Sequence, residues 1–187
     1  MVSNTSVKFF CIAFFVKVLI FMTPSSTYAQ GSPNSSKTVD DFCNQRSTSE
    51  DRAFCLTVLK SNPRSATATD NISLLKIAKD LAVGNAKKTR DFFTTLTKNN
   101  GTRPSLLPVL DECISAYDES ITELLLVTQD LVDDPPMTAY DAHVANQEMN
   151  RCQDILKTNG VSDDFILSRH KIASDYGRLI EEIAKSI

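Results

Sequence analysis

The sequence predicts an all-α protein: an up-down four-helix bundle preceded by a short N-terminal helical hairpin, with two disulfides. Four long segments carry apolar residues at spacings of three and four, which is typical of helices that bury one face. No segment shows sustained alternation of apolar and polar residues, so strands are not expected. The connections between the four segments are short, which favours antiparallel neighbours in a bundle.

The first 29 residues have the layout of a secretory signal peptide. Lys8 supplies a basic start, residues 9–22 are apolar apart from Lys17, and a small-residue exit ends at Ala29. A membrane anchor is the alternative, but the apolar run is shorter than the roughly 20 residues that a spanning helix needs. We therefore expect cleavage after Ala29 and secretion. The polar stretch at residues 30–37 predicts a flexible leader.

The domain that follows, residues 38–187, begins with two short helical pieces within residues 38–61. Ser47 and the glutamate three residues later fit a capping box for the second piece. Cys43 and Cys55 lie one in each piece, so a bond between them would close a helical hairpin. An Asn-Pro-Arg-Ser turn then ends the unit, because proline lacks an N–H and restricts the residue before it.

The rest of the domain, residues 70–187, predicts the four-helix bundle. Turn signals separate the helices: Asn-Asn-Gly, then Asp-Asp-Pro-Pro, then Asn-Gly. Cys113 and Cys152 fall on the apolar stripes of the second and third helices, so a bridge between them would tie antiparallel neighbours. The four helices are expected at residues 70–98, 103–132, 138–157 and 163–187.

Cysteine usage indicates two disulfides. Of five cysteines, Cys11 leaves with the signal peptide and four remain. An even number in an oxidising compartment indicates disulfides, although four cysteines permit three connectivities. Sequence adjacency favours Cys43–Cys55 and Cys113–Cys152. No metal site is expected, because the chain lacks CxxC and HxxxH spacings and has only two histidines.

The net charge and the N-glycosylation sequons indicate which partners and modifications the surface of the protein is expected to have. Loss of the signal peptide removes two lysines and no acid, which moves the net charge from −3 to −5. An acidic chain is a poor partner for nucleic acid and for anionic membranes. Acceptor sequons begin at Asn34, Asn71 and Asn100, and the secretory route makes each a candidate glycosylation site. Asn71 and Asn100 must lie on the surface if they carry sugar.

The sequence offers little for catalysis. It contains no G-x-S-x-G, Walker or H-E-x-x-H motif, and no cofactor is expected. His143 and His170 lack an accompanying nucleophile motif, so we expect structural or solvated roles. Adjacent acids such as Glu181 and Glu182 are expected to be solvated helix caps and not a glycosidase pair. An acidic, cross-linked bundle of this kind suits binding another folded protein, so an enzyme is not expected.

The order of motifs resembles the plant invertase and pectin methylesterase inhibitor family over essentially the whole mature chain. The motifs are the hairpin cysteines, Asn-Pro-Arg-Ser-Ala-Thr-Ala at residues 62–68, Leu-Asp-Glu-Cys-Ile-Ser-Ala-Tyr at residues 110–117, and Cys152. The resemblance implies disulfides that pair first with second and third with fourth, and no catalytic activity. It also implies a monomer that binds a plant enzyme one-to-one and blocks its active site, in the apoplast or alternatively the vacuole.

The choice of target depends on one segment. Acid-invertase inhibitors of the family present a Pro-Lys-Phe loop before the helix with the fourth cysteine, where this chain has Pro135, Pro136 and Met137. The missing lysine removes an anchor for a desolvated pocket, which slightly favours pectin methylesterase as the target. Residues 129–134 and 174–180 look closer to the invertase side, and acid invertase is the alternative.

The segment from Asp133 through Asp134 to Met137 is therefore the candidate for target contacts, expected as a stiff acidic loop. Two other classes of protein share the features above. One is a secreted structural protein without an inhibitory target. The other is a carrier of a small ligand, which a well-formed cavity between the helices would favour.

Overall fold

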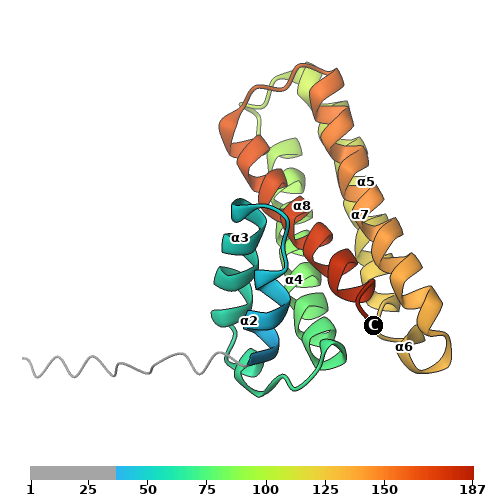
Figure 1. Cartoon of the computed structure of the whole chain (residues 1–187). Helices are drawn as coiled ribbons and strands as arrows, with labels where there is room; N and C mark the ends of the chain where they lie inside the picture. Colours follow the sequence, from blue (N-terminus) through green and yellow to red (C-terminus); the bar gives the residue numbers. More distant parts are fainter. Residues whose placement is uncertain (1–36) are drawn as a thin grey trace, which may run out of the picture. The chain divides into compact units, whose positions relative to one another are not determined.

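The computed structural model describes residues 37–187, and every regular element within them is a helix (Figure 1). The predicted signal peptide and the sequon at Asn34 lie outside the described residues. So does the predicted leader except for its last residue, Lys37, which begins the first described helix. No helix among the described residues has both the length and the apolar character that crossing a membrane requires.

The N-terminal hairpin consists of α2 (Lys37–Asn44) and α3 (Ser49–Lys60), joined by the Cys43–Cys55 disulfide. The cap predicted at Ser47 was wrong by one residue. Thr48 is extended and its hydroxyl accepts a hydrogen bond from the backbone N–H of Asp51 at 3.0 Å. Both positions have an acid three residues later, so the sequence pattern alone did not separate them. A short 3-10 helix, η1 (Pro63–Thr67), follows.

Four long helices form the bundle: α4 (Asn71–Thr97), α5 (Leu107–Leu126), α7 (Pro135–Thr158) and α8 (Asp164–Ala184). Each packs against two others in the ring α4–α5–α7–α8, and the hairpin lies beside α4 and α8 (Figure 1). Carboxylates cap two of them, since Asp70 forms a capping box with Ser73 and Asp163 accepts backbone N–H bonds at the start of α8.

The predicted helix at residues 103–132 is three pieces: η2 (Pro104–Leu106), α5 and the one-turn α6 (Asp130–Asp133). The predicted loop through Met137 was also wrong. Only Asp134 separates α6 from α7, because Pro135 and Pro136 occupy the first turn of α7. Proline's fixed φ and missing N–H are tolerated at this position, so the prolines begin the helix.

The disulfide between Cys113 and Cys152 joins α5 to α7 inside the core, with the two Cα atoms 4.7 Å apart. Two turns further along α5, the Ser120 hydroxyl donates to the carbonyl oxygen of Ala145 at 2.9 Å. These two links fix an antiparallel register in which the last turn of α5 lies level with the first turns of α7.

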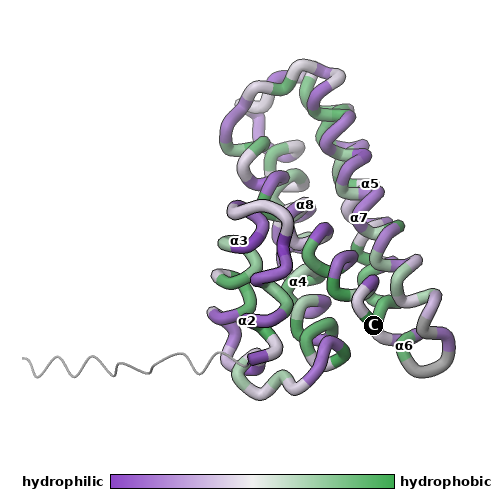
Figure 2. Tube along the Cα trace, viewed as in Figure 1, coloured by the Kyte–Doolittle hydropathy of each residue, from purple (hydrophilic) through white to green (hydrophobic). Residues whose placement is uncertain are grey.

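The core lies on the inward faces of the four helices, and Tyr117 and Phe93 are among its largest fully buried side chains. Hydrophobic and hydrophilic positions are interleaved along each labelled helix, as expected for amphipathic helices (Figure 2). Helices α7 and α8 pack tightly at Gly177, where an added Cβ would lie 2.7 Å from the sulfur of Met149. Gly160 ends α7 with a φ of +62°, the left-handed conformation that glycine adopts readily.

Candidate functional site

The segment predicted for target contacts lies at the corner where α6 leads into α7 (Figure 1). Asp133 is the last residue of α6 and Pro135 the first of α7. The side chains of Asp134, Pro136 and Met137 are exposed. The backbone turns tightly, because the N–H of Met137 donates to the carbonyl of Asp134 at 2.9 Å. A helical corner, and not an extended loop, therefore presents these residues.

Three exposed apolar side chains lie at this end of the bundle, and we call Leu125, Met137 and Tyr140 the corner patch. Met137 and Tyr140 are three residues apart on α7, so they share one face. The α5–α7 register places Leu125 level with Tyr140, whose side chain is 57% exposed. The sequence reasoning missed Leu125 and Tyr140. The sequence pattern that could have identified them is a large apolar residue outside the buried stripe of its helix.

Acidic residues are frequent in the same segment of the chain as the corner patch. Residues 123–142 contain five acidic residues and no lysine, arginine or histidine. Asp141 is only 2% exposed, and its Oδ2 has no hydrogen-bond partner among the described residues. Burial, with a hydrogen bond to Asp130 and the charges of Asp130 and Glu123, raises the pKa of Asp141 to about 6. This end of the bundle therefore combines exposed apolar side chains with acidic residues, of which Asp134 is exposed.

The two histidines have separate environments. His170 is buried, and its Nδ1 lies 2.9 Å from the hydroxyl of Tyr117. Burial lowers the pKa of His170 to about 4, so the ring is neutral in mildly acidic and neutral solution. His143 is partly exposed and its Nδ1 lies 2.8 Å from Glu181. Neither histidine has a serine or cysteine among its hydrogen-bond partners in the described part of the chain.

Glu181 contradicts the expectation of a solvated cap, since its side chain is buried in α8. The amide of Asn146 donates to it at 2.6 Å, and His143 and Lys185 also contact its carboxylate. Burial raises the pKa of Glu181, but hydrogen bonds from Lys185, His143 and Asn146 outweigh that effect and the net pKa is lowered. The carboxylate thus links α7 to α8. Among residues 37–187, no cluster of three metal-donor side chains is present.

The two described sequons differ. The side-chain amide of Asn71, the atom that would carry a glycan, donates to the backbone carbonyl and the hydroxyl of Ser186 at 3.3 and 3.0 Å. Asn100 is exposed in the turn after α4.

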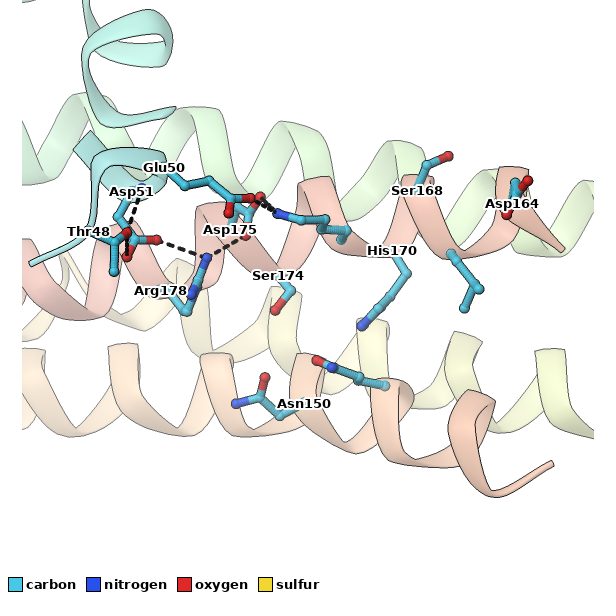
Figure 3. Close-up of a pocket in the computed structure, with 13 residues that line it drawn as sticks. Thr48, Glu50, Asp51, Asn150, Asp164, Ser168, His170, Ser174, Asp175 and Arg178 are labelled. Atoms are coloured by element: carbon cyan, nitrogen blue, oxygen red, sulfur yellow. Dashed lines mark hydrogen bonds and ion pairs between the residues drawn. The ribbon is translucent and has the colours of Figure 1, made fainter. Parts of the chain in front are cut away.

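An open groove of about 870 Å³ also lies among α3, α7 and α8, with His170 at its floor (Figure 3).

The chain matches the family model described as plant invertase/pectin methylesterase inhibitor over residues 37–180. It is 28% identical over 148 residues to the cell wall / vacuolar inhibitor of fructosidase 2 of Arabidopsis thaliana. The match covers 76% of this chain and 78% of that protein.

Two solved structures share the fold. The mutant form A of a pectin methylesterase inhibitor from Arabidopsis has a TM-score of 0.67 at 18% identity, over 80% of this chain and 96% of that one. A pectin methylesterase inhibitor from Arabidopsis thaliana has a TM-score of 0.57 at 17% identity, over 80% and 95%. Because the family model covers most of the sequence, this chain belongs to the plant invertase/pectin methylesterase inhibitor family, whose matched members are inhibitors and not enzymes.

Proposed function

We propose that this protein is secreted to the apoplast and inhibits a cell-wall pectin methylesterase as a monomer, one-to-one, by blocking its active site. The observation that carries the choice of target is the corner patch: three exposed apolar side chains at one end of the bundle, in a segment, residues 123–142, that holds five acidic residues and no cation.

The substrate's chemistry supports this choice. Pectin is a polymer of galacturonate and its methyl ester, and demethylation leaves carboxylates along the chain. A cleft that binds such a polymer gains from positive potential, and a negatively charged surface would be drawn to it. The apolar patch supplies the desolvated centre that binding energy concentrates on, with Tyr140 as its largest anchor. The acidic residues of the same segment, of which Asp134 is exposed, would supply a complementary acidic rim.

Inhibition of a fructosidase is the second candidate, and the sequence relative favours it, since that Arabidopsis protein is named as an inhibitor of fructosidase. Glycoside hydrolysis uses a pair of carboxyl groups across the cleft. Exposed Asp134 would be repelled by such a pair unless one carboxyl were protonated. Pro136 and Met137 also stand where the resemblance places a lysine and an aromatic residue in invertase inhibitors. A cell-wall or a vacuolar location would fit this alternative.

The experiment is inhibition of a purified pectin methylesterase by the native protein and by Tyr140→Ala. Loss of a central aromatic anchor costs at least about 2 kcal/mol, which raises the inhibition constant roughly 30-fold. Inhibition should also weaken with added salt, because the acidic rim acts through screened charges.

Phe165→Ala is the matched control, because Phe165 is 81% exposed at the other end of the bundle, at the start of α8. It should leave inhibition unchanged. Equal effects of the two variants would show that the corner patch does not contact the enzyme. A complete lack of inhibition by the native protein would favour the non-inhibitory structural protein.

A further inference from the structure

A groove opens between α7 and α8, beneath the start of α3 (Figure 3). The two long helices touch at Gly177 and Met149. Beyond that contact, toward the start of α8, the facing side chains are Ser174 and His170 from α8 and Asn150 and Gln153 from α7. The groove's volume of about 870 Å³ lies within the range of small-molecule sites.

His170 carries an unused hydrogen-bonding atom at the floor of this groove. The ring is 4% exposed, and its Nε2 has no partner among the described residues. The buried Tyr117 hydroxyl has one side-chain partner, the Nδ1 of His170 at 2.9 Å. If Tyr117 donates its proton to Nδ1, the imidazole proton resides on Nε2, which is buried just beneath the floor of the groove. Leaving such a donor unpaired costs about 1–3 kcal/mol, which an acceptor in the groove would offset.

The other floor residues are also free to bond. No side-chain hydrogen bond joins Ser174, Asn150 or Gln153 to another described residue, whereas amides and hydroxyls both donate and accept. In Figure 3, His170 and Ser174 point from α8 toward the helix that carries Asn150. Convergent polar groups in a concave surface are characteristic of ligand sites.

Both cations at the rim of the groove are paired with acids. Lys171 pairs with Glu50 and Asp175 at 2.9 Å each, and Arg178 pairs with Asp51 and Asp175 at 3.1 and 2.6 Å (Figure 3). These pairs tie α3 to α8 and leave no unpaired cation over the floor within the described residues. An anionic ligand would have to break these pairs to reach a cation, whereas a neutral ligand would not.

We propose that this groove binds a neutral, hydroxyl-rich ligand of about the size of a disaccharide. One ligand hydroxyl accepts the proton of His170 Nε2, and others pair with the amides of Asn150 and Gln153. The ligand is either a free sugar or a neutral glycan carried by another molecule. The site is separate from the corner patch, since Asn150 is ten residues along α7 from Tyr140, about 15 Å of helix.

The test is an NMR titration of the isotope-labelled protein with sucrose, with cellotetraose and with trigalacturonate. The first probe represents a free neutral sugar, the second a neutral glycan and the third a charged sugar. Binding should shift the His170 ring nitrogens and the backbone amides around Asn150 and Gln153. Sucrose binding would assign the site to free sugars, and binding of cellotetraose alone would assign it to glycans.

The double variant Asn150→Leu with Gln153→Leu should weaken binding of the ligand about tenfold, because each leucine loses the hydrogen bonds that the amide makes to the ligand. Both side chains lie on the surface, so the double variant should still fold. Gln147→Leu is the control, since Gln147 is exposed on α7 outside the groove. It should bind as the native protein does.

The proposal is overturned if neither neutral probe shifts the groove resonances at about 50 mM, a concentration that detects millimolar affinity. It is also overturned if trigalacturonate binds more tightly than both, or if the control variant loses as much affinity as the double variant. Pectin methylesterase inhibition should be unaffected by the double variant, so failure here leaves the proposed function untouched.

Discussion

Replacing the buried Asp141 with asparagine should stabilise the protein at neutral pH and leave its stability in acid nearly unchanged. Asp141 is enclosed in α7 with one carboxylate oxygen unpartnered, and burial together with Asp130 and Glu123 raises its pKa. Asparagine has almost the same shape as the protonated acid and has no proton to lose. The substitution therefore removes the cost of ionising a buried group.

The magnitude follows from the pKa. A change from 3.8 to about 6 is roughly two units, at 1.36 kcal/mol each, which gives about 3 kcal/mol. Because the raised pKa lets the folded state hold a proton that the unfolded state has lost, the free energy of unfolding falls as pH rises from about 4 to about 6. The gain of Asp141→Asn should grow across that window and stay constant above it. For a chain of this size, the melting temperature should rise by about 6–12 °C.

The assay is urea unfolding of both proteins at about pH 3.5, 5 and 7. Asp154→Asn is the control, since Asp154 is exposed on the same helix and surface substitutions usually change stability by less than about 0.5 kcal/mol. A gain for Asp141→Asn of the same size at all three pH values, or no gain at pH 7, would refute the account of a buried carboxyl ionised at a cost.

The remaining predictions concern packing, modification and cross-linking. Gly177→Ala should destabilise the protein by about 1–3 kcal/mol in urea unfolding, because the new Cβ would lie 2.7 Å from the Met149 sulfur. Gly84→Ala should instead stabilise the protein by about 0.5–1 kcal/mol, because nothing lies within 4 Å of the added Cβ. A change of the same sign in the free energy of unfolding of both variants would contradict this. Mass spectrometry of the secreted protein should find a glycan at Asn100 more often than at Asn71, whose amide is hydrogen-bonded. Non-reducing peptide mapping should recover only the two disulfide pairs described above, and a peptide that links the hairpin to α5 would exclude them.

The all-helical bundle was predictable because each long helix has apolar residues at spacings of three and four, a pattern that is visible within the segment itself. The same stripe put Cys113 and Cys152 on facing surfaces, and the structure pairs them. Helix boundaries near prolines were not predictable in the same way. Pro135 is compatible with both a turn and a first helical position, and packing of α7 against α5 selects the second.

The candidate site was harder to predict from the sequence than the fold. Asp134, Pro136 and Met137 were singled out by resemblance, and they do lie together on the surface. Leu125 and Tyr140 join the corner patch only through the register of two helices that are separated in sequence, which no local pattern encodes. Likewise, Glu181 is next to another acid in the chain, and only the fold shows that it is buried against α7.

The measurement that tests the central claim most directly is calorimetric titration of the purified protein against a pectin methylesterase and, separately, an acid invertase. A stoichiometry of one with the pectin methylesterase, weakened by salt and by Tyr140→Ala, is the result that we predict. Tight binding to the invertase that Tyr140→Ala leaves intact, with no binding to the pectin methylesterase, would contradict the account.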